Sequence, residues 1–157
     1  MIPSETGCRP GGEAEADEIA GLLDRFQREF DEYTPGAGPL AERVRAHVAS
    51  EASVFVLAGP RHVGVAQLRF RDHLFTADPV CLLEEFYVVP EYRGRGYGTA
   101  VLSGAIHLAR RRGAATMELG TAQNDTAARN LYEKYGFTNL ERAGHPETRM
   151  LYYEREI

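Results

Sequence analysis

The sequence contains no tryptophan, only two cysteines and no long run of apolar residues. Two cysteines cannot build the disulfide framework of a small secreted protein, so we interpret Cys8, near a terminus expected to be loose, and Cys81, in an apolar stretch, as structural. No stretch approaches the roughly 20 consecutive apolar residues that a membrane helix requires, and residues 1–10 lack the pattern of a signal peptide. We therefore expect a cytoplasmic protein without a membrane partner.

The histidines are scattered along the chain, and none of them forms an HxH or HxxxH pair. Metal sites commonly draw their ligands from such close spacings, so we predict no metal. Neither cysteine has a histidine at a spacing that indicates an activated thiol, and we expect no covalent enzyme intermediate. The histidines are His47, His62, His73, His107 and His145.

The net charge of −5 is unevenly distributed. Residues 1–35 contain nine acids and three arginines, a net charge of −6, whereas residues 91–113 contain five arginines and one acid, a net charge of +4. An acidic protein is a poor nucleic-acid binder, but a local basic segment can hold a phosphorylated small molecule. We therefore predict no nucleic-acid partner, and the basic segment indicates a phosphate ligand.

A chain of 157 residues with 43% apolar residues has room for one hydrophobic core, so we predict a single domain over residues 1–157. Apolar residues at helical spacing predict helices, and apolar stretches bounded by turns predict strands. Their alternation along the chain indicates an α+β fold in which helices flank a mixed sheet. The helices are expected at residues 14–31, 38–49, 97–113 and 126–135, and the strands at 54–57, 63–70, 81–89, 116–119, 137–141 and 149–154.

The chemistry is concentrated where the strand at residues 81–89 ends and the helix at residues 97–113 begins. The connecting segment from Arg93 to Gly98 reads RGRGYG. Glycines allow backbone N–H groups to approach a ligand closely, and the start of a helix carries a partial positive charge. A strand, an arginine- and glycine-rich loop and a helix in this order are typical of a phosphate site.

Other phosphate-binding loops fit this segment less well. A Walker loop requires GK[ST], which the sequence lacks. A dinucleotide-binding fingerprint is expected near the first strand, with an acid about 20 residues further on and no arginines within it. The segment from Arg93 to Gly98 therefore fits neither of these two classes of phosphate-binding loop.

Two motifs, in order, resemble those of the GCN5-related N-acetyltransferase (GNAT) superfamily. Arg93-x-x-Gly96-x-Gly98 is similar to the family's pyrophosphate-binding motif, and residues 125–137, DTAARNLYEKYGF, resemble its second marker, commonly NxxAxxLYEKxGF. The specific match covers roughly residues 83–137. The resemblance implies a mostly antiparallel central sheet that is flanked by helices and splayed at the cofactor strand, and it implies acetyl-coenzyme A (acetyl-CoA) as co-substrate.

The resemblance also implies a path for the cofactor. The pyrophosphate would bind the loop, and the pantetheine arm would lie beside the preceding strand, whose backbone would contact the arm and the acetyl oxygen. Asp125 stands where the family has asparagine, so either Asn124 or Asp125 would contact pantetheine. The implied cofactor-binding residues are Phe86, Tyr87, Val88, Val89, Arg93, Gly94, Arg95, Gly96, Tyr97, Gly98, Thr99, Asn124, Asp125, Ala128 and Arg129.

Tyr132 is the candidate general acid. It lies two helical turns after Asp125, on the same side of the helix, and the small Ala128 one turn back leaves room for a ligand. A phenol with a pKa of ~10 can donate a proton to a departing thiolate whose conjugate acid has a pKa of ~8.5. The alternative is a core tyrosine that packs beside Leu131 and Phe137.

Glu84 and Glu85 are two carboxylates within an apolar strand. Strict strand alternation places them on opposite faces, where they cannot form a pair. In the polyamine-type acetyltransferases that this strand resembles most, an acid four residues before the position of Val88 takes the acceptor's proton, often through water, which implies Glu84 as the catalytic base. Alternatively, each acid pairs with an arginine of the neighbouring strand, such as Arg69 or Arg71.

These motifs predict an acetyl-CoA-dependent N-acetyltransferase that transfers the acetyl group to an amine by direct attack in a ternary complex. The acidic N-terminal segment favours a neutral or cationic small-molecule amine as acceptor. Acetylation of a protein lysine or N-terminus is an alternative. So is a silent acyl-CoA sensor, which would share the phosphate loop without needing Tyr132 or Glu84. The sequence leaves a homodimer open.

Overall fold

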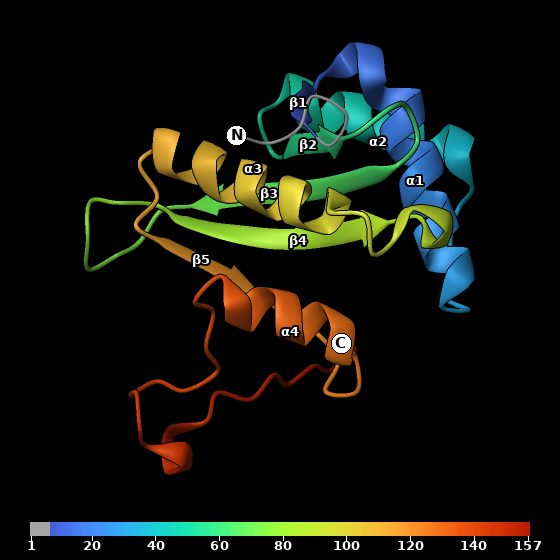
Figure 1. Ribbon diagram of the computed structural model, residues 1–157. Helices are drawn as coiled ribbons and strands as arrows, with labels where there is room; N and C mark the ends of the chain where they lie inside the picture. Colours follow the sequence, from blue (N-terminus) through green and yellow to red (C-terminus); the bar gives the residue numbers. More distant parts are fainter. Residues whose placement is uncertain (1–6) are drawn as a thin grey trace. The chain divides into compact units, whose positions relative to one another are not determined.

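The computed structural model describes residues 7–157, which divide into two compact units, one ending at Leu119 and the other comprising Gly120–Ile157. The first unit holds a five-stranded sheet (Figure 1). Among residues 7–157 no helix is long and apolar enough to cross a membrane. The elements of the first unit are β1 (Cys8–Gly11), η1 (Glu13–Glu15), α1 (Ala16–Glu29), α2 (Ala37–Ala49), β2 (Val54–Ala58), β3 (Gly64–Arg71), β4 (Val80–Val88), η2 (Pro90–Tyr92), α3 (Tyr97–Arg111) and β5 (Thr116–Leu119).

The strands follow the order β1-β2-β3-β4-β5 across the sheet. All neighbours pair antiparallel except β4 and β5, which pair in parallel. A connection between parallel strands must cross the sheet, and here α3 provides that crossover. The predicted α+β fold with a mostly antiparallel sheet and flanking helices is therefore confirmed.

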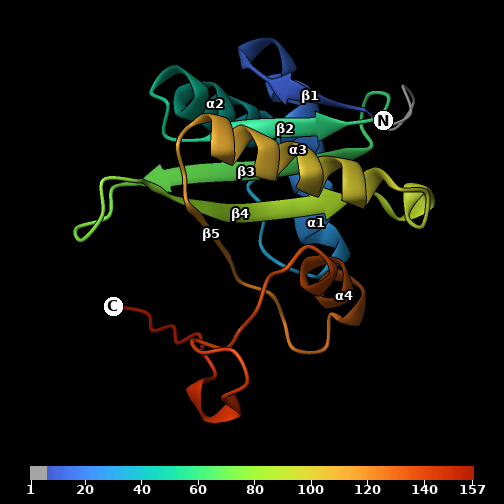
Figure 2. The ribbon, with the colours of Figure 1, turned by 60° about the vertical axis from the view of Figure 1, so that its left-hand side comes forward.

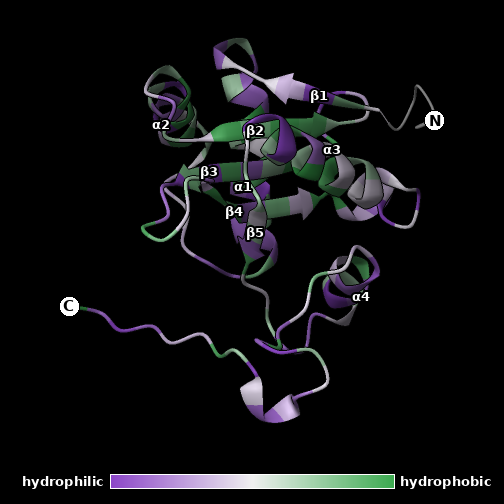
Figure 3. Cartoon of the chain, turned by 90° about the vertical axis from the view of Figure 1, so that its left-hand side faces the viewer, coloured by the Kyte–Doolittle hydropathy of each residue, from purple (hydrophilic) through white to green (hydrophobic). Residues whose placement is uncertain are grey.

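The helices of the first unit cover both faces of its sheet (Figure 2). On one face, Ile19 and Leu22 of α1 and Val44 of α2 join Phe55, Val65 and other buried strand residues in a single hydrophobic cluster. On the other face lies α3, whose buried residues include Val101, Leu102 and Ala105. The hydrophobic colour in Figure 3 is accordingly concentrated along β2 and β3, between the helices.

Cys8, which was expected near a loose terminus, is itself part of the sheet, because it begins β1. β1 pairs with β2 over its whole length, with Cys8 opposite Ala58 and Gly11 opposite Phe55. The sequence CRPG has no strand pattern of its own, so its conformation depends on the neighbouring strand.

The second unit contains α4 (Thr126–Lys134) and a short η3 (Pro146–Thr148). Asp125 is the N-cap of α4, as predicted, and its carboxylate accepts the N–H of Ala128 at 3.1 Å. Gly136, with φ +86°, terminates the helix in a left-handed conformation.

The predicted strands at residues 137–141 and 149–154 do not form in the described chain. Leu140 and Arg149 make one isolated antiparallel bridge, and no further pairing follows it. Leu151, Tyr152 and Tyr153 are exposed. A two-stranded ribbon is marginal unless a face of it packs against another layer, so the apolar pattern alone was not sufficient.

Candidate functional site

β4 loses a neighbouring strand halfway along its length. β5 pairs with β4 only from Val80 to Leu83, whose partner Leu119 is the last residue of β5. Beyond Leu83, β4 remains paired with β3 as far as Val88. Within the first unit, the second half of β4 therefore presents one open edge. The splay that the family resemblance implies at this strand stays a prediction. Backbone N–H and C=O groups on such an edge are available to a ligand.

Val88 directs its backbone groups to this open edge. The next residue, Val89, donates its N–H to the carbonyl of Val63, on the β3 side, at 3.0 Å. Because successive residues of a strand direct their hydrogen-bonding groups to opposite sides, the N–H and carbonyl of Val88 point away from β3.

The loop after β4 holds two glycines in conformations that other residues rarely adopt. Gly94 and Gly96 have φ values of +73° and +89°, and a Cβ on either would meet open space. Gly96 is the N-cap of α3, and no side chain caps the helix. The N–H groups of the first turn have no partner within a helix, so Gly98 and Thr99 present a local anion site.

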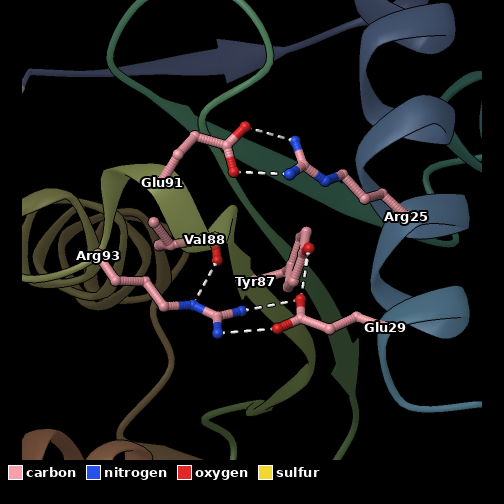
Figure 4. A network of polar contacts seen from close by, with 6 residues as sticks. All are labelled: Arg25, Glu29, Tyr87, Val88, Glu91 and Arg93. Carbon is pink, nitrogen blue, oxygen red and sulfur yellow. Dashed lines mark hydrogen bonds and ion pairs between the residues drawn. The ribbon is translucent and has the colours of Figure 1, made fainter.

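The two arginines of the loop have different surroundings. Arg95 lies over the Tyr92 ring, with its Cζ 5.4 Å from the ring centroid, and no ion pair involves it among residues 7–157. Arg93 is turned toward α1 instead (Figure 4). Its Nη1 and Nη2 contact the Glu29 carboxylate at 2.8 and 2.9 Å, and its Nε donates to the carbonyl of Val88 at 2.9 Å.

Tyr87 completes this network from β4. Its hydroxyl donates to Glu29 at 2.7 Å, and its ring stacks on Phe26 with centroids 4.9 Å apart. Burial, reinforced by the Glu29 carboxylate, raises the pKa of Tyr87 to about 12. Burial also acts to raise the pKa of Glu29, but the hydrogen bonds from Arg93 and Tyr87 outweigh it and leave that pKa lowered. At neutral pH Glu29 is therefore charged and Tyr87 is neutral.

Glu84 is the extra residue of a β-bulge, which corrects the predicted alternation. Gln67 and Leu68, adjacent on β3, pair with Glu85 and Leu83, so Glu84 has no partner of its own in the register. Its carboxylate lies 3.6 Å from Arg69, which is on the same face of β3 as Gln67. The two acids therefore lie toward the same face of the sheet.

The two acids differ in their surroundings. Glu84 is exposed and pairs with Arg69, as the alternative interpretation predicted, whereas Arg71 pairs with Glu118 at 2.8 Å. Glu85 is half-buried, and burial, followed by repulsion from Glu84, raises its pKa. By this physical criterion, Glu85 is also a candidate base.

The second unit contributes the remaining predicted residues. Tyr132 is buried and makes an edge-to-face contact with Phe137, with centroids 5.9 Å apart. Burial, followed by the charge of Asp125, raises the pKa of Tyr132 to about 12. Arg129 donates to the carbonyl of Gln123 at 2.9 Å. Asn124 directly precedes the helix cap, and Ala128 donates its N–H to that cap.

The first unit brings together the residues predicted from the pyrophosphate motif. The side chains of Val89 and Tyr97 are buried, and a Cβ on Gly59 would lie 2.5 Å from the Tyr97 ring. These two residues can therefore offer a ligand only their backbone groups. The predicted residues at the end of β4 and the start of α3 are Phe86, Tyr87, Val88, Val89, Arg93, Gly94, Arg95, Gly96, Tyr97, Gly98 and Thr99.

An open sheet edge beside a glycine-rich helix start defines a site for a ligand with phosphates and an extended polar arm. The model of the acetyltransferase (GNAT) family matches residues 18–137, so the chain belongs to this family. It is an acetyl-CoA-dependent N-acetyltransferase, as the two motifs predicted.

Similar proteins support this assignment. The chain is 31% identical over 105 residues to an aminoglycoside N(6')-acetyltransferase type 1 of Klebsiella aerogenes, a match to 64% of this chain and 69% of that protein. A solved structure from Arthrobacter sp. FB24, assigned as an acetyltransferase, is 41% identical with a TM-score of 0.88, covering 98% of this chain and 97% of that one. An uncharacterised N-acetyltransferase of Methanocaldococcus jannaschii is 37% identical over 62 residues, 40% of this chain and 27% of its own length.

Proposed function

We propose that the enzyme transfers the acetyl group of acetyl-CoA to the amine of a small molecule by direct attack in a ternary complex. The observation that carries this proposal is the open edge of β4, which ends at Val88 beside the loop of Gly94 and Gly96. The relative in Klebsiella aerogenes acts on an aminoglycoside, which is an amine of this class.

In this proposal the backbone holds most of the cofactor. The N–H groups of residues 94–99 bind the pyrophosphate, Arg95 adds positive charge, and the edge of β4 from Phe86 to Val89 pairs with the pantetheine arm. The N–H of Val88 stabilises the oxyanion that forms on the thioester carbonyl. Either Asn124 or Asp125 contacts the arm from the second unit. We propose one acetyltransferase domain over residues 1–157, because the family match spans both units.

The acceptor must lose a proton before it attacks, because an ammonium group has no lone pair. Glu84, through water, is the proposed base. Glu85 is a second candidate, because its raised pKa suits a proton acceptor near neutral pH better than that of an ordinary carboxylate. Both acids lie toward one face, so a single water could serve either.

In the transfer step the C–N bond forms, the thioester C–S bond breaks, and the sulfur leaves as a thiolate. The nitrogen loses its surplus proton to solvent as it becomes an amide. Tyr132 is the proposed donor to that sulfur. With a pKa of about 12 it is protonated at neutral pH, as a donor must be. Complete transfer to a thiolate whose conjugate acid has a pKa of ~8.5 would be about 5 kcal/mol uphill. We therefore assign Tyr132 a hydrogen bond that stabilises the thiolate, which then takes its proton from solvent.

Thiol release from acetyl-CoA, measured with a panel of amines, tests the proposal. The panel contains aminoglycosides, polyamines, amino acids and lysine peptides. Turnover with a small amine is the expected result. Turnover confined to peptides would identify a protein acetyltransferase, and cofactor binding without thiol release for any amine would identify an acyl-CoA sensor. Either outcome would overturn the proposal.

A further inference from the structure

Two arginine–glutamate pairs connect α1 to the segment between β4 and α3, residues 89–96, which we call the cofactor loop. Only one of the two pairs reaches the backbone of β4 (Figure 4). Arg25 and Glu91 form an exposed pair with N–O distances of 2.8 and 2.6 Å. Arg93 and Glu29 form the second pair, and the same guanidinium also holds the Val88 carbonyl. The first pair tethers the helix to the loop. The second fixes a peptide group at the open edge.

The pyrophosphate motif by itself suggests a different use for Arg93. An arginine beside a helix start commonly donates to phosphate oxygens. Here, each of the three guanidinium nitrogens of Arg93 already has an acceptor within 2.9 Å. The Glu29 carboxylate is itself held by Tyr87, whose ring stacks on α1. Arg93 is therefore oriented by a residue of α1 rather than by the loop.

We propose that Glu29 is a positioning residue for acetyl transfer, which orients Arg93 so that its Nε holds the Val88 carbonyl at the open edge of β4. Val88 is the last residue of β4, and it has no strand neighbour on that side within the first unit. The peptide between Val88 and Val89 is held on the β3 side, where the Val89 N–H donates to Val63, and on the open side, where Arg93 donates to the Val88 carbonyl. A strand end that loses one of two such contacts is less firmly fixed. The position of the end of β4 thus depends in part on Glu29 of α1, acting through Arg93.

This inference rests on the proposed function, in which the backbone of Val88 stabilises the oxyanion. If Arg93 releases the Val88 carbonyl, the end of β4 can shift. The Val88 N–H, which belongs to the preceding peptide and is aimed at the thioester oxygen, is then misplaced with it. Misplacement by about 1 Å costs up to roughly 100-fold in rate, while cofactor affinity, which depends on many contacts, changes less. Loss of Glu29 should therefore lower kcat more than it changes the affinity for acetyl-CoA.

Three variants of the full chain separate the alternatives. Glu29→Gln keeps the shape of the side chain and removes the charge that orients Arg93. Arg93→Lys keeps the positive charge but cannot reach Glu29 and the Val88 carbonyl together, because an ammonium lacks the planar fork. Arg25→Gln is the matched control, since it breaks the other pair between α1 and the loop and removes no hydrogen bond to the Val88 carbonyl.

The readouts are kcat, acetyl-CoA affinity by calorimetry, and the ¹⁵N–¹H resonance of Val89, whose N–H belongs to the Val88 peptide. We expect Glu29→Gln and Arg93→Lys each to shift the Val89 resonance and to lower kcat about tenfold, with affinity changed less than about threefold. The double variant should be no worse than the worse single variant, because both remove one interaction. Arg25→Gln should leave the Val89 resonance and kcat unchanged.

Two results would overturn the proposal. In the first, Arg93→Lys has a near-normal kcat and Glu29→Gln binds acetyl-CoA more tightly than the wild type. Arg93 would then be a phosphate ligand, and Glu29 would only compete with the phosphate for it. In the second, Arg25→Gln and Glu29→Gln change kcat and the Val89 resonance equally. Both pairs would then only hold α1 and the loop together, and Glu29 would have no particular role in positioning Val88. The Val89 resonance reports on the Val88 peptide even if no amine is acetylated. A failure of the proposed function would appear in the wild-type enzyme, separately from this test.

Discussion

The thiol of Cys8 lies directly against Gly104 in the middle of α3. A Cβ built on Gly104 would come within 2.6 Å of the Cys8 sulfur and 3.0 Å of the Cys8 Cβ. Alanine is the better helix former, so glycine at this position costs helix stability. Its benefit is the close approach of β1 to the helix that follows the cofactor loop.

Gly104→Ala should therefore destabilise the protein by about 1–3 kcal/mol, because the overlap with Cys8 exceeds the gain in helix propensity. Gly21→Ala in α1 is the matched control, since nothing lies within 4 Å of a Cβ at that position. It should stabilise the protein by up to about 1 kcal/mol. Urea denaturation of both variants measures the difference, and equal shifts in the two would contradict the packing argument.

Gly96→Glu should abolish acetyl-CoA binding, because a carboxylate would stand where the pyrophosphate is proposed to bind. The left-handed backbone at Gly96 adds strain in the variant, so strain needs its own control. Gly113→Glu provides it, because Gly113 has a φ of +83° and equally open surroundings at the far end of α3. Calorimetry should show binding by the Gly113 variant only. Normal affinity in a folded Gly96 variant would remove the loop from the site.

Tyr132→Phe should lower kcat by about 100-fold if its hydroxyl stabilises the departing thiolate. The ring and its contact with Phe137 are retained. The melting temperature, measured alongside, separates a loss of stability from a loss of catalysis. Acetyl-CoA affinity serves as the internal control and should be preserved. A kcat within about twofold of wild type would make Tyr132 a core residue only.

Glu84→Gln should lower kcat/KM and remove its acidic limb, because the rate falls as the base gains a proton. Glu85→Gln is the comparison. The folded-state pKa of Glu85 is raised, so an acidic limb that lies above pH 4.5 and disappears in this variant would make Glu85 the base instead. A profile changed by neither substitution would contradict a base on β4.

Stability provides an independent check on Glu85. A carboxyl with a raised pKa in the folded state favours folding fully below its ordinary value of 4.5 and loses that contribution as pH rises through the folded-state pKa. Glu85→Gln should accordingly be stabilising at pH 7 and lose that advantage below pH 4.5. Thermal unfolding at the two pH values measures this.

Besides the fold class, the structural predictions that held were local ones. The helix start after the loop from Arg93 to Gly98 and the cap at Asp125 depend on residues within a few positions of one another, so the sequence alone indicates their conformation. β1 depends on a partner about 50 residues away, and the pairing of Glu29 with Arg93 spans 64 residues. Neither leaves a periodic signal. The bulge at Glu84 is likewise a property of two strands together.

The charge of the N-terminal segment is also modified by distant partners. Its net charge of −6 suggested attraction for a cationic acceptor. Asp17 pairs with Arg45, Glu18 with Arg9, and Glu29 with Arg93. Four acids of the segment have no ion pair in the described part of the chain: Glu13, Glu15, Asp31 and Glu32. A preference for cationic acceptors remains a prediction, and it now depends on these carboxylates rather than on the whole segment.

The bulge reverses which residues of β4, odd- or even-numbered, lie on a given face of the sheet. Before it, the odd-numbered Cys81 and Leu83 pair with Phe70 and Leu68 of β3. After it, the even-numbered Phe86 and Val88 share a face with those residues. Deleting Glu84 would let side chains alternate between the two faces without interruption along the whole strand. No buried side chain would be removed, so folding could survive the deletion. The bend at the start of the open edge would be lost. The geometry of the site thus depends on the number of residues in this strand as much as on their identity.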